Sequence, residues 1–509
     1  MNAMFKKALL MLLALAMILS VAACGTKDSS DGASGEKVTV NIAFGAMANS
    51  LDPIREDINT TISICNHIYD RLIEFDANYN WVPSVAKSLP VKVGPRSWTI
   101  EIDLENHKFH NGDMLTMDDV VYSLLRIKDI PKSADTGAMI ESVTYEGNVI
   151  TITSVDEDNT FMPRVLLMCI IVSKSDIETR GEDLAVFNDP IGTGPYRVVE
   201  FIPGNTAVFE TWDGYLKPKP QIDRLVFTAI PDNAARYIAV ESGQIQYAFR
   251  VTPFELDMAK AKGGFNTIDM ESNRVMSFLF NCEREPFDNV NVRRGIMHAL
   301  NVDAYNALLG GRPVALSHIF VGFDLFYAPS NRLQYNLEEA RRLLSAEGYT
   351  PDNPLRFSLL HFEADPGFEM FQADLRTVGV EMTLEMVEFS VYLSREGPGD
   401  FDVTWVSAPN RGGDALVDLD RYDYNFVGMR NLSRYFNPRV QEIIGAMRVS
   451  NDQQELRTLG REINEILAND IPQFSVYNTR VICVMDGGLT GVTIRPDMQQ
   501  NFRNASYNP

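Results

Sequence analysis

The sequence contains few of the residues that usually build metal centres or nucleophilic active sites. It has 5 cysteines and 6 histidines among 509 residues, and it has no Gly-x-Ser-x-Gly stretch. Only His107 and His110 have a spacing that resembles a metal motif, and a zinc site needs several more converging ligands. Neither a zinc centre nor a serine hydrolase elbow is therefore expected.

The cysteines are too scattered to suggest a disulfide framework, and no Cys-x-x-Cys pair is present. The four cysteines beyond the N-terminal segment permit one or two disulfides if the chain is exported, but a chain of this length builds a core without them. Their apolar surroundings favour buried free thiols, and disulfides stay open as the alternative. The cysteines beyond the N-terminal segment are Cys65, Cys169, Cys282 and Cys483.

Positive charge is also in short supply. Lysine and arginine total 46 against 68 aspartates and glutamates, which gives a formal net charge of −22. Such a chain is repelled by nucleic acid and by an anionic membrane surface, so neither is expected as a direct partner. The hydrophobic content of 45% is that of a protein with ordinary packed cores.

Long apolar runs are missing everywhere except near the N-terminus. Residues 8–19 are apolar without interruption and follow Lys6 and Lys7. This run is too short to span a bilayer, so residues 1–23 are predicted to be a signal peptide.

The end of this segment carries a second signal. Val21-Ala22-Ala23 before Cys24 resembles the bacterial lipobox, which implies a lipidated cysteine at the new N-terminus. Residues 24–37 would then be the lipidated Cys24 and a flexible polar tether. The alternative is plain secretion, with Cys24 incidental.

Removing 23 residues from 509 leaves 486, which is enough for about three domains. Alternating patterns predict strands at residues 38–44 and 98–104, and Thr116 is predicted to cap a helix. The region of about 70–189 has its own strands, caps and turns, which indicates a subdomain inserted into the first domain.

One turn ends this insertion, at Pro190-Ile191-Gly192-Thr193-Gly194-Pro195-Tyr196. Two glycines and two prolines cannot continue a helix or a regular ladder, and glycine reaches positive φ at little cost. Strand-like residues follow. The turn is therefore interpreted as the point where the chain returns to its first sheet, and an ordinary Gly/Pro loop is the alternative.

The second half has the pattern of a second α/β domain. A helix is predicted at 288–309, and residues 355–362, 368–378 and 380–389 read as a β-α-β unit with parallel strands. Two further helices are predicted, one at 438–447 with Asn437 as its cap and Pro438 at its first position, and one at 453–468. The strand-like run 474–484 would lead back to the first domain.

Several separated stretches together resemble one family. They are Ser50-Leu-Asp-Pro53, Ile68-Tyr-Asp-Arg-Leu-Ile73, Phe109-His-Asn-Gly112, Leu115-Thr-Met-Asp-Asp-Val120, Gly192-Thr-Gly-Pro-Tyr196, Pro286-Phe-Asp288, Val292-Arg-Arg294 and Asn437-Pro438. In this order, over about residues 38–480, they are similar to the family 5 solute-binding proteins of bacterial ABC importers, which include oligopeptide-, dipeptide- and nickel-binding proteins.

The resemblance implies an α/β, two-lobed fold like that of periplasmic binding proteins, with an extra subdomain and two crossover segments between the lobes. Lobe I is expected at 38–272 plus 480–509, with the inserted subdomain at about 70–189, and lobe II at 273–479. A peptide-like solute would be captured between the lobes by hinge closure. The implied protein is a monomer without catalytic residues, cofactor or resident metal, lipid-anchored outside the cytoplasmic membrane, and partnered by a permease and an ATPase.

In peptide-binding members of the family, an aspartate of the second lobe pairs with the α-ammonium of the ligand. The matching position is Asp414, and a solvated acidic loop is the alternative for it. Trp405 is either an apolar wall of the site or a core residue, and Arg411 is either a partner of a ligand carboxylate or a surface arginine. Two further sets of candidates are Tyr422, as a stacking residue, and Met47 and Asn49, in the loop after the first strand.

The sequence departs from the dipeptide binders in one loop. The arginine that receives the ligand carboxylate there has no counterpart in His361-Phe-Glu-Ala-Asp-Pro366. A longer peptide held through its backbone is therefore expected. The alternatives are the same fold binding a nickel chelate, haem or an oligosaccharide, and a secreted hydrolase.

Overall fold

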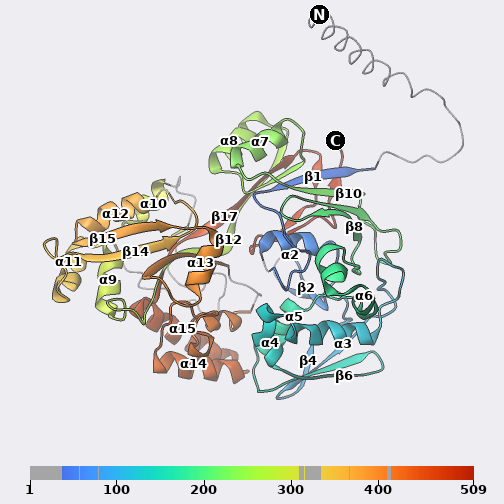
Figure 1. Ribbon diagram of the computed structural model, residues 1–509, viewed down its shortest axis with the longest axis horizontal. Helices are drawn as coiled ribbons and strands as arrows, with labels where there is room; N and C mark the ends of the chain where they lie inside the picture. The colour runs from blue at the N-terminus through green and yellow to red at the C-terminus, as the bar shows by residue number, and fades with distance from the viewer. Residues whose placement is uncertain are drawn as a thin grey trace, which may run out of the picture. The chain divides into compact units, whose positions relative to one another are not determined.

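The computed structural model describes residues 37–509 except 57, 78–79, 309–313, 316–333, 366 and 410–413. Its largest element is an 11-stranded sheet with the order β15-β14-β16-β12-β17-β11-β1-β10-β9-β8, and β13 pairs with β17 beside this path (Figure 1). Its strands are β1 (Thr39–Phe44), β8 (Tyr196–Ile202), β9 (Thr206–Thr211), β10 (Arg224–Ala229), β11 (Tyr247–Phe249), β12 (Phe265–Phe280), β13 (Val314–Ala315), β14 (Leu355–His361), β15 (Val380–Met386), β16 (Val403–Pro409) and β17 (Gln473–Asp486).

The long strands β12 and β17 pair antiparallel and connect two separate cores. The C-terminal end of β17 pairs with β11 and so continues the sheet into the first core. The C-terminal half of β12 pairs with β16 and so continues the sheet into the second core. The register shifts between the pairs Glu271↔Arg480 and Val275↔Asn478. This irregularity divides the sheet into two parts, which we call the first lobe (β1 and β8–β11) and the second lobe (β14–β16).

In the first lobe, β1 is parallel to both β10 and β11. One buried cluster contains β1 residues Val40 and Ile42 together with Phe209 and Phe227, and α2 (Asn59–Cys65) contributes to it. On the other face, α7 (Asn233–Glu241) and α8 (Pro253–Lys262) pack against the sheet in a second cluster. The strands are thus covered on both faces, as parallel strands require.

A subdomain with its own core lies in the chain between β1 and β8. Its sheet has the order β4-β5-β7-β6, and a separate buried cluster includes Trp98, Phe161 and Ile152. Thr116 caps α3 with a complete capping box, as predicted. The elements are β2 (Ile73–Phe75), β3 (Trp81–Pro83), β4 (Val91–Gly94), β5 (Ser97–Glu101), α3 (Met117–Leu125), α4 (Ala134–Ala138), β6 (Ile140–Glu146), β7 (Val149–Ser154), α5 (Phe161–Met168) and α6 (Lys174–Arg180).

The turn after this subdomain needs its glycines for a different reason from the predicted one. Neither Gly192 nor Gly194 has a positive φ. Instead, a Cβ on Gly192 would lie 2.0 Å from the carbonyl oxygen of Ile68, and a Cβ on Gly194 would lie 2.6 Å from that of His67. The Gly194 N–H donates to the Ile68 carbonyl at 2.8 Å, so close backbone approach fixes the turn.

The second lobe contains the predicted β-α-β unit. β14 and β15 are parallel and joined by α12 (Phe368–Arg376), and β14 is also parallel to β16. The helix predicted at 288–309 is two helices, α9 (Val290–Ala299) and α10 (Val302–Leu308). Leu300 is extended between them, and the side chain of Asn301 accepts the Ala304 N–H at 3.0 Å, so a new N-terminus interrupts the helix.

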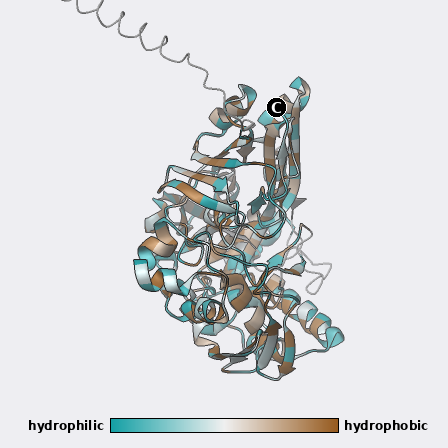
Figure 2. Cartoon of the chain, turned by 90° about the vertical axis from the view of Figure 1, so that its right-hand side faces the viewer, coloured by the Kyte–Doolittle hydropathy of each residue, from teal (hydrophilic) through white to brown (hydrophobic). Residues whose placement is uncertain are grey.

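The remaining helices complete the second lobe. Figure 2, in which the right-hand side of Figure 1 faces the viewer, shows hydrophilic and hydrophobic residues interspersed along the helices and strands of that side. Asn437 caps α14 with Pro438 at its first position, as predicted. The helices are α11 (Leu337–Ala346), α13 (Phe389–Glu396), α14 (Pro438–Val449) and α15 (Gln453–Asp470). The chain then passes through β17 to β18 (Leu489–Thr490), β19 (Thr493–Ile494), β20 (Gln500–Asn501) and β21 (Ser506–Tyr507). Within the described residues, no helix is both long and apolar enough to cross a membrane.

Candidate functional site

Asp414 lies between β16 and the 3-10 helix η5 (Val417–Arg421). Its Oδ1 accepts the Leu416 N–H at 2.8 Å. Burial raises the pKa of Asp414, while the N–H groups of Leu416 and Val417 and the guanidinium of Arg164 act in the opposite direction. The side chain is therefore a partly desolvated carboxylate that a further cation would stabilise in its charged form.

The guanidinium that influences Asp414 comes from the other lobe. Arg164, on α5 of the inserted subdomain, donates to the carboxylate of Asp420 on η5, and both side chains are buried. Arg448 on α14 also pairs with Asp420, with 2.8 Å between its Nη2 and Oδ1. The ring of Phe426 lies beneath both guanidiniums, at 5.3 Å and 5.6 Å from its centroid.

Backbone groups add to the same contact. The Asn159 N–H donates to the Arg448 carbonyl at 2.7 Å, and its side-chain amide donates to the Ser450 carbonyl at 2.9 Å. We call Asn159, Arg164, Asp420, Arg448 and Ser450 the inter-lobe contact. No local sequence pattern predicts this inter-lobe contact, because its hydrogen-bonded partners lie more than two hundred residues apart in the chain.

The two aromatic candidates are core residues in this structure. Trp405 is 3% exposed and packs edge-on against Phe278 at 4.9 Å and Phe368 at 5.4 Å. Tyr422 is 0% exposed, and its hydroxyl donates to the Gln473 side chain at 3.2 Å. Burial leaves Tyr422 no face for stacking on a ligand and favours the core alternative for Trp405. Arg411 lies outside the described residues.

The loop after β1 places its two candidates differently. Met47 is buried in the first-lobe core. Asn49 is exposed, and its backbone N–H and side-chain amide donate to the carboxylate of Glu56 at 2.9 Å and 3.0 Å. Of these two candidates, Asn49 is therefore the one with an exposed polar side chain.

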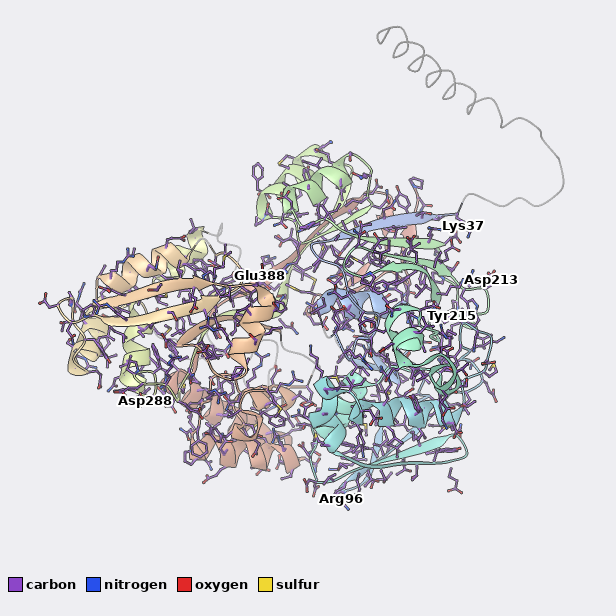
Figure 3. The ribbon with its side chains drawn as sticks, viewed as in Figure 1. Lys37, Arg96, Asp213, Tyr215, Asp288 and Glu388 are labelled. Carbon is purple, nitrogen blue, oxygen red and sulfur yellow. The ribbon has the colours of Figure 1, made fainter. Side chains whose placement is uncertain are left out.

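The carboxyl ends of the parallel strands β14 and β15 carry acidic residues that the sequence analysis did not single out. Asp365 accepts the Tyr305 hydroxyl at 2.8 Å, and burial raises its pKa. Glu363 is exposed in the same loop, and Glu388 is exposed where β15 passes into α13 (Figure 3). Met386 and Phe389 beside Glu388 are 66% and 47% exposed. This edge, where α/β folds bind ligands, combines carboxylates with apolar side chains.

His107 and His110 have structural roles, and one cavity of the described residues lies apart from the predicted site residues. A ring nitrogen of His107 contacts the Asp103 carbonyl at 2.7 Å within the subdomain, and one of His110 contacts the Gly194 carbonyl at 2.9 Å, which connects the subdomain to the turn that follows it. A cavity of about 350 Å³ lies in the second lobe and is lined by Glu283, Asp288 and Arg434 among others. Asp288 is labelled in Figure 3, and no predicted site residue lines this cavity.

Comparisons with known proteins match nearly the whole chain. A family model described as "Bacterial extracellular solute-binding proteins, family 5 Middle" matches residues 80–428. The dipeptide-binding protein of Escherichia coli K12 is 24% identical over 477 residues, covering 86% of this chain and 89% of that protein. The nickel-binding protein NikA of Staphylococcus aureus is 22% identical over 485 residues, covering 91% and 92%.

The fold has a counterpart among solved structures. The dipeptide binding protein of Pseudoalteromonas sp. SM9913 in complex with Met-Leu superposes with a TM-score of 0.83 at 17% identity, covering 92% of this chain and 100% of that one. This likeness confirms the predicted fold class, which is a two-lobed α/β fold of the periplasmic-binding-protein type.

Proposed function

The chain belongs to the family 5 bacterial extracellular solute-binding proteins, and from this premise we propose that it captures a peptide-like solute between its lobes and delivers it to an ABC importer. The observation that carries the proposal is the position of Asp414. It is a partly desolvated carboxylate of the second lobe with a raised pKa, which the charge of Arg164 in the inserted subdomain partly lowers again.

The local charges favour an ammonium group as the partner of Asp414. Arg164 already donates to Asp420, so it does not neutralise Asp414 by a direct ion pair. An ammonium placed against a carboxylate of low hydration forms a charge-assisted hydrogen bond, which is stronger than a neutral one. A peptide supplies such a group at its N-terminus.

Closure of the lobes is the proposed mechanism of capture. A solute that contacts both lobes binds the closed state more tightly and so shifts the population toward it. The hinge would lie at the register shift of β12 and β17, near Glu271 and Arg480. The proposed lobe boundaries, 38–272 with 480–509 and 273–479, pass through this point, and the inserted subdomain at about 70–189 moves with the first lobe.

The export of the protein and its partners form a separate part of the proposal. Residues 1–23 are proposed to be removed as a signal peptide, and Cys24, which lies outside the described residues, to be lipidated. The protein would then act as a monomer on the outer face of the bacterial cytoplasmic membrane. Its partners would be a permease and an ATPase, with no nucleic acid involved.

A nickel chelate is the second candidate solute, because relatives of comparable similarity include a nickel-binding protein. Within the part of the chain that the structure describes, no group of three or more histidine, cysteine, aspartate or glutamate side chains is arranged to hold a metal ion directly. A nickel solute would therefore bind as a preformed chelate. Haem, an oligosaccharide and hydrolase activity have no observation in their favour.

The test is identification of the bound solute, followed by calorimetry. We expect mass spectrometry of the protein purified under native conditions to show peptides. We also expect titration with Met-Leu or tetra-alanine to show binding, and chromatography to recover both peptides intact. Binding of nickel(II)-histidine but of neither peptide would favour the second candidate, and cleavage of the peptides would contradict a binding role.

A further inference from the structure

The loop after β14 contains no arginine or lysine, so the second lobe supplies no cation there for the carboxylate end of a peptide. Arg250, in the first lobe, is exposed, and its side chain forms no ion pair or hydrogen bond within the described residues. We propose that Arg250 is the residue that receives an anionic group of the solute. The inference rests on the proposed function and deepens it, because the solute would then be a zwitterion with a free carboxylate.

The first argument is the place of Arg250 in the sheet. It directly follows β11, which is buried and runs parallel to β1 with Ile42 opposite Tyr247 and Ala43 opposite Ala248. Arg250 therefore lies at the carboxyl edge of two adjacent parallel strands, beside the loop that follows β1. In α/β folds this edge is where ligands bind.

The second argument is the conformation of its backbone. Arg250 has a φ of 60°, in the left-handed region that residues with a Cβ rarely adopt. The structure holds it there, because its carbonyl accepts from Arg236 Nη2 at 2.9 Å and the Val251 N–H donates to the Ile482 carbonyl at 3.2 Å. Such strain tends to persist where a side chain must be aimed for function.

The third argument is electrostatic. Arg236 is 2% exposed, and its guanidinium donates to backbone carbonyls, including that of Pro231 at 2.9 Å. Burial lowers the pKa of Arg236, and the charge of Arg250 lowers it further. Two guanidiniums thus lie within reach of each other at one strand edge, and only Arg250 is open to solvent. An anion bound there relieves their repulsion.

The fourth argument is what lies near Arg250 on the far side of the hinge. Val251, the residue after Arg250, donates its N–H to the Ile482 carbonyl of β17, and Tyr477 of the same strand packs against Tyr305 with ring centroids 5.6 Å apart. The Tyr305 hydroxyl donates to Asp365, in the loop after β14. The strand β17 therefore connects the segment of Arg250 to this edge of the second lobe, whose carboxylates suit the cationic end of a zwitterion while Arg250 suits the other end.

The test compares free-acid peptides with their C-terminal amides by calorimetry. The probes are Met-Leu and tetra-alanine, each with a free and an amidated C-terminus. Wild-type protein is expected to bind the acids at least tenfold more tightly than the amides. Arg250→Gln is expected to bind the acids at least tenfold more weakly than wild type and to distinguish acid from amide no longer. Arg461→Gln, which changes an exposed arginine on α15, is the matched control and should behave as wild type.

A second variant separates binding from folding. Arg250→Gly removes the guanidinium but suits the positive φ, so its melting temperature should be no lower than that of wild type while its affinity for the acids falls. If either variant still prefers acids to amides by the wild-type factor, Arg250 does not receive the carboxylate. If wild-type protein binds none of the probes, the proposed peptide function itself fails, and this inference fails with it.

Discussion

Arg164 of the inserted subdomain and Asp420 of the second lobe form an ion pair between the lobes, with side chains only 5% and 3% exposed. Burying two charges is costly unless further hydrogen bonds satisfy them. Here Arg448 donates to the same carboxylate at 2.8 Å, and the Thr160 hydroxyl accepts from Arg164 Nε at 2.9 Å. The contact therefore has a defined geometry, and it can exist only while the two lobes are together.

Arg164→Gln is expected to shift the ligand-free protein toward an open state. The change removes one cation from Asp420 but leaves Arg448, so we expect a loss of about 1–3 kcal/mol from the closed state, less than for breaking an isolated buried pair. Small-angle scattering should show a larger radius of gyration, and calorimetry a weaker affinity for the solute.

The matched control is Arg96→Gln in the same subdomain, since Arg96 pairs with Glu141 at the surface with 45% and 49% exposure. This pair is worth little, so scattering and affinity should match wild type. Equal scattering curves for Arg164→Gln and Arg96→Gln would show that the inter-lobe contact does not set the balance of states.

Asp414→Asn tests the proposed ammonium partner. The amide oxygen can still accept the Leu416 N–H, so the local turn should survive while the charge is lost. We expect a peptide solute to lose about 3–5 kcal/mol of binding free energy, as when one member of a buried pair is removed. Calorimetry with a free and an N-acetylated peptide measures it, and the variant should no longer distinguish the two.

Proton linkage gives the same prediction an independent readout. Burial raises the pKa of Asp414 in the free protein, and a bound ammonium would lower it again. Affinity should therefore rise with pH through the raised pKa and level off above it. The unliganded Asp414→Asn protein should melt no lower than wild type at neutral pH, because it no longer buries this charge. Unchanged affinity in the variant would remove Asp414 from the site.

The sequence predicted the local structure where the signal was local. The caps at Thr116 and Asn437 and the β-α-β unit after residue 355 are short-range patterns, and all are present in the structure. The helix predicted at 288–309 was wrong as a single helix, because the side chain of Asn301 starts a new one. Asn side chains compete for backbone groups in a way that apolar spacing does not reveal.

The candidate site was harder to predict, since its geometry depends on long-range pairing. Asp414 could be named from its match to the family, but the neighbourhood of Arg164 could not, because α5 and η5 are joined only by the tertiary fold. Arg250 could not be predicted either, because no sequence pattern indicates that an arginine adopts a left-handed φ. Trp405 was ambiguous and Tyr422 was assigned to stacking on a ligand, because the sequence does not distinguish an aromatic side chain in a core from one in a ligand wall.

Gly192→Ala is expected to destabilise the protein strongly. The added Cβ would lie 2.0 Å from the Ile68 carbonyl oxygen. This is a backbone atom, and it cannot move without shifting the turn that leads into β8. We expect the free energy of unfolding to fall by about 2–4 kcal/mol. Gly445→Ala on α14 is the control, because nothing lies within 4 Å of the added Cβ and alanine favours a helix. Urea denaturation that finds the two variants equally stable would contradict the close-approach argument.

His67 should make the protein sensitive to mild acid. Its ring is fully buried, Nε2 accepts the Phe502 N–H at 2.9 Å, and Nδ1 lies 3.2 Å from the Ile64 carbonyl. Burial and the charge of Arg503 lower the pKa of His67 to about 3. A histidine with a depressed pKa stays neutral in the folded protein while the unfolded chain takes up a proton, so stability falls as pH drops below the unfolded pKa of about 6.5.

The expected slope is about 1.4 kcal/mol per pH unit from this one residue between its unfolded and folded pKa values. Protonation would remove the acceptor that holds Phe502, so hydrogen exchange at pH 5 should show residues 500–503 losing protection before the strands of the sheet. His67→Asn should be less stable than wild type at pH 7 but should lose less stability between pH 7 and pH 5. An identical slope in both proteins would show that the acid sensitivity comes from other groups.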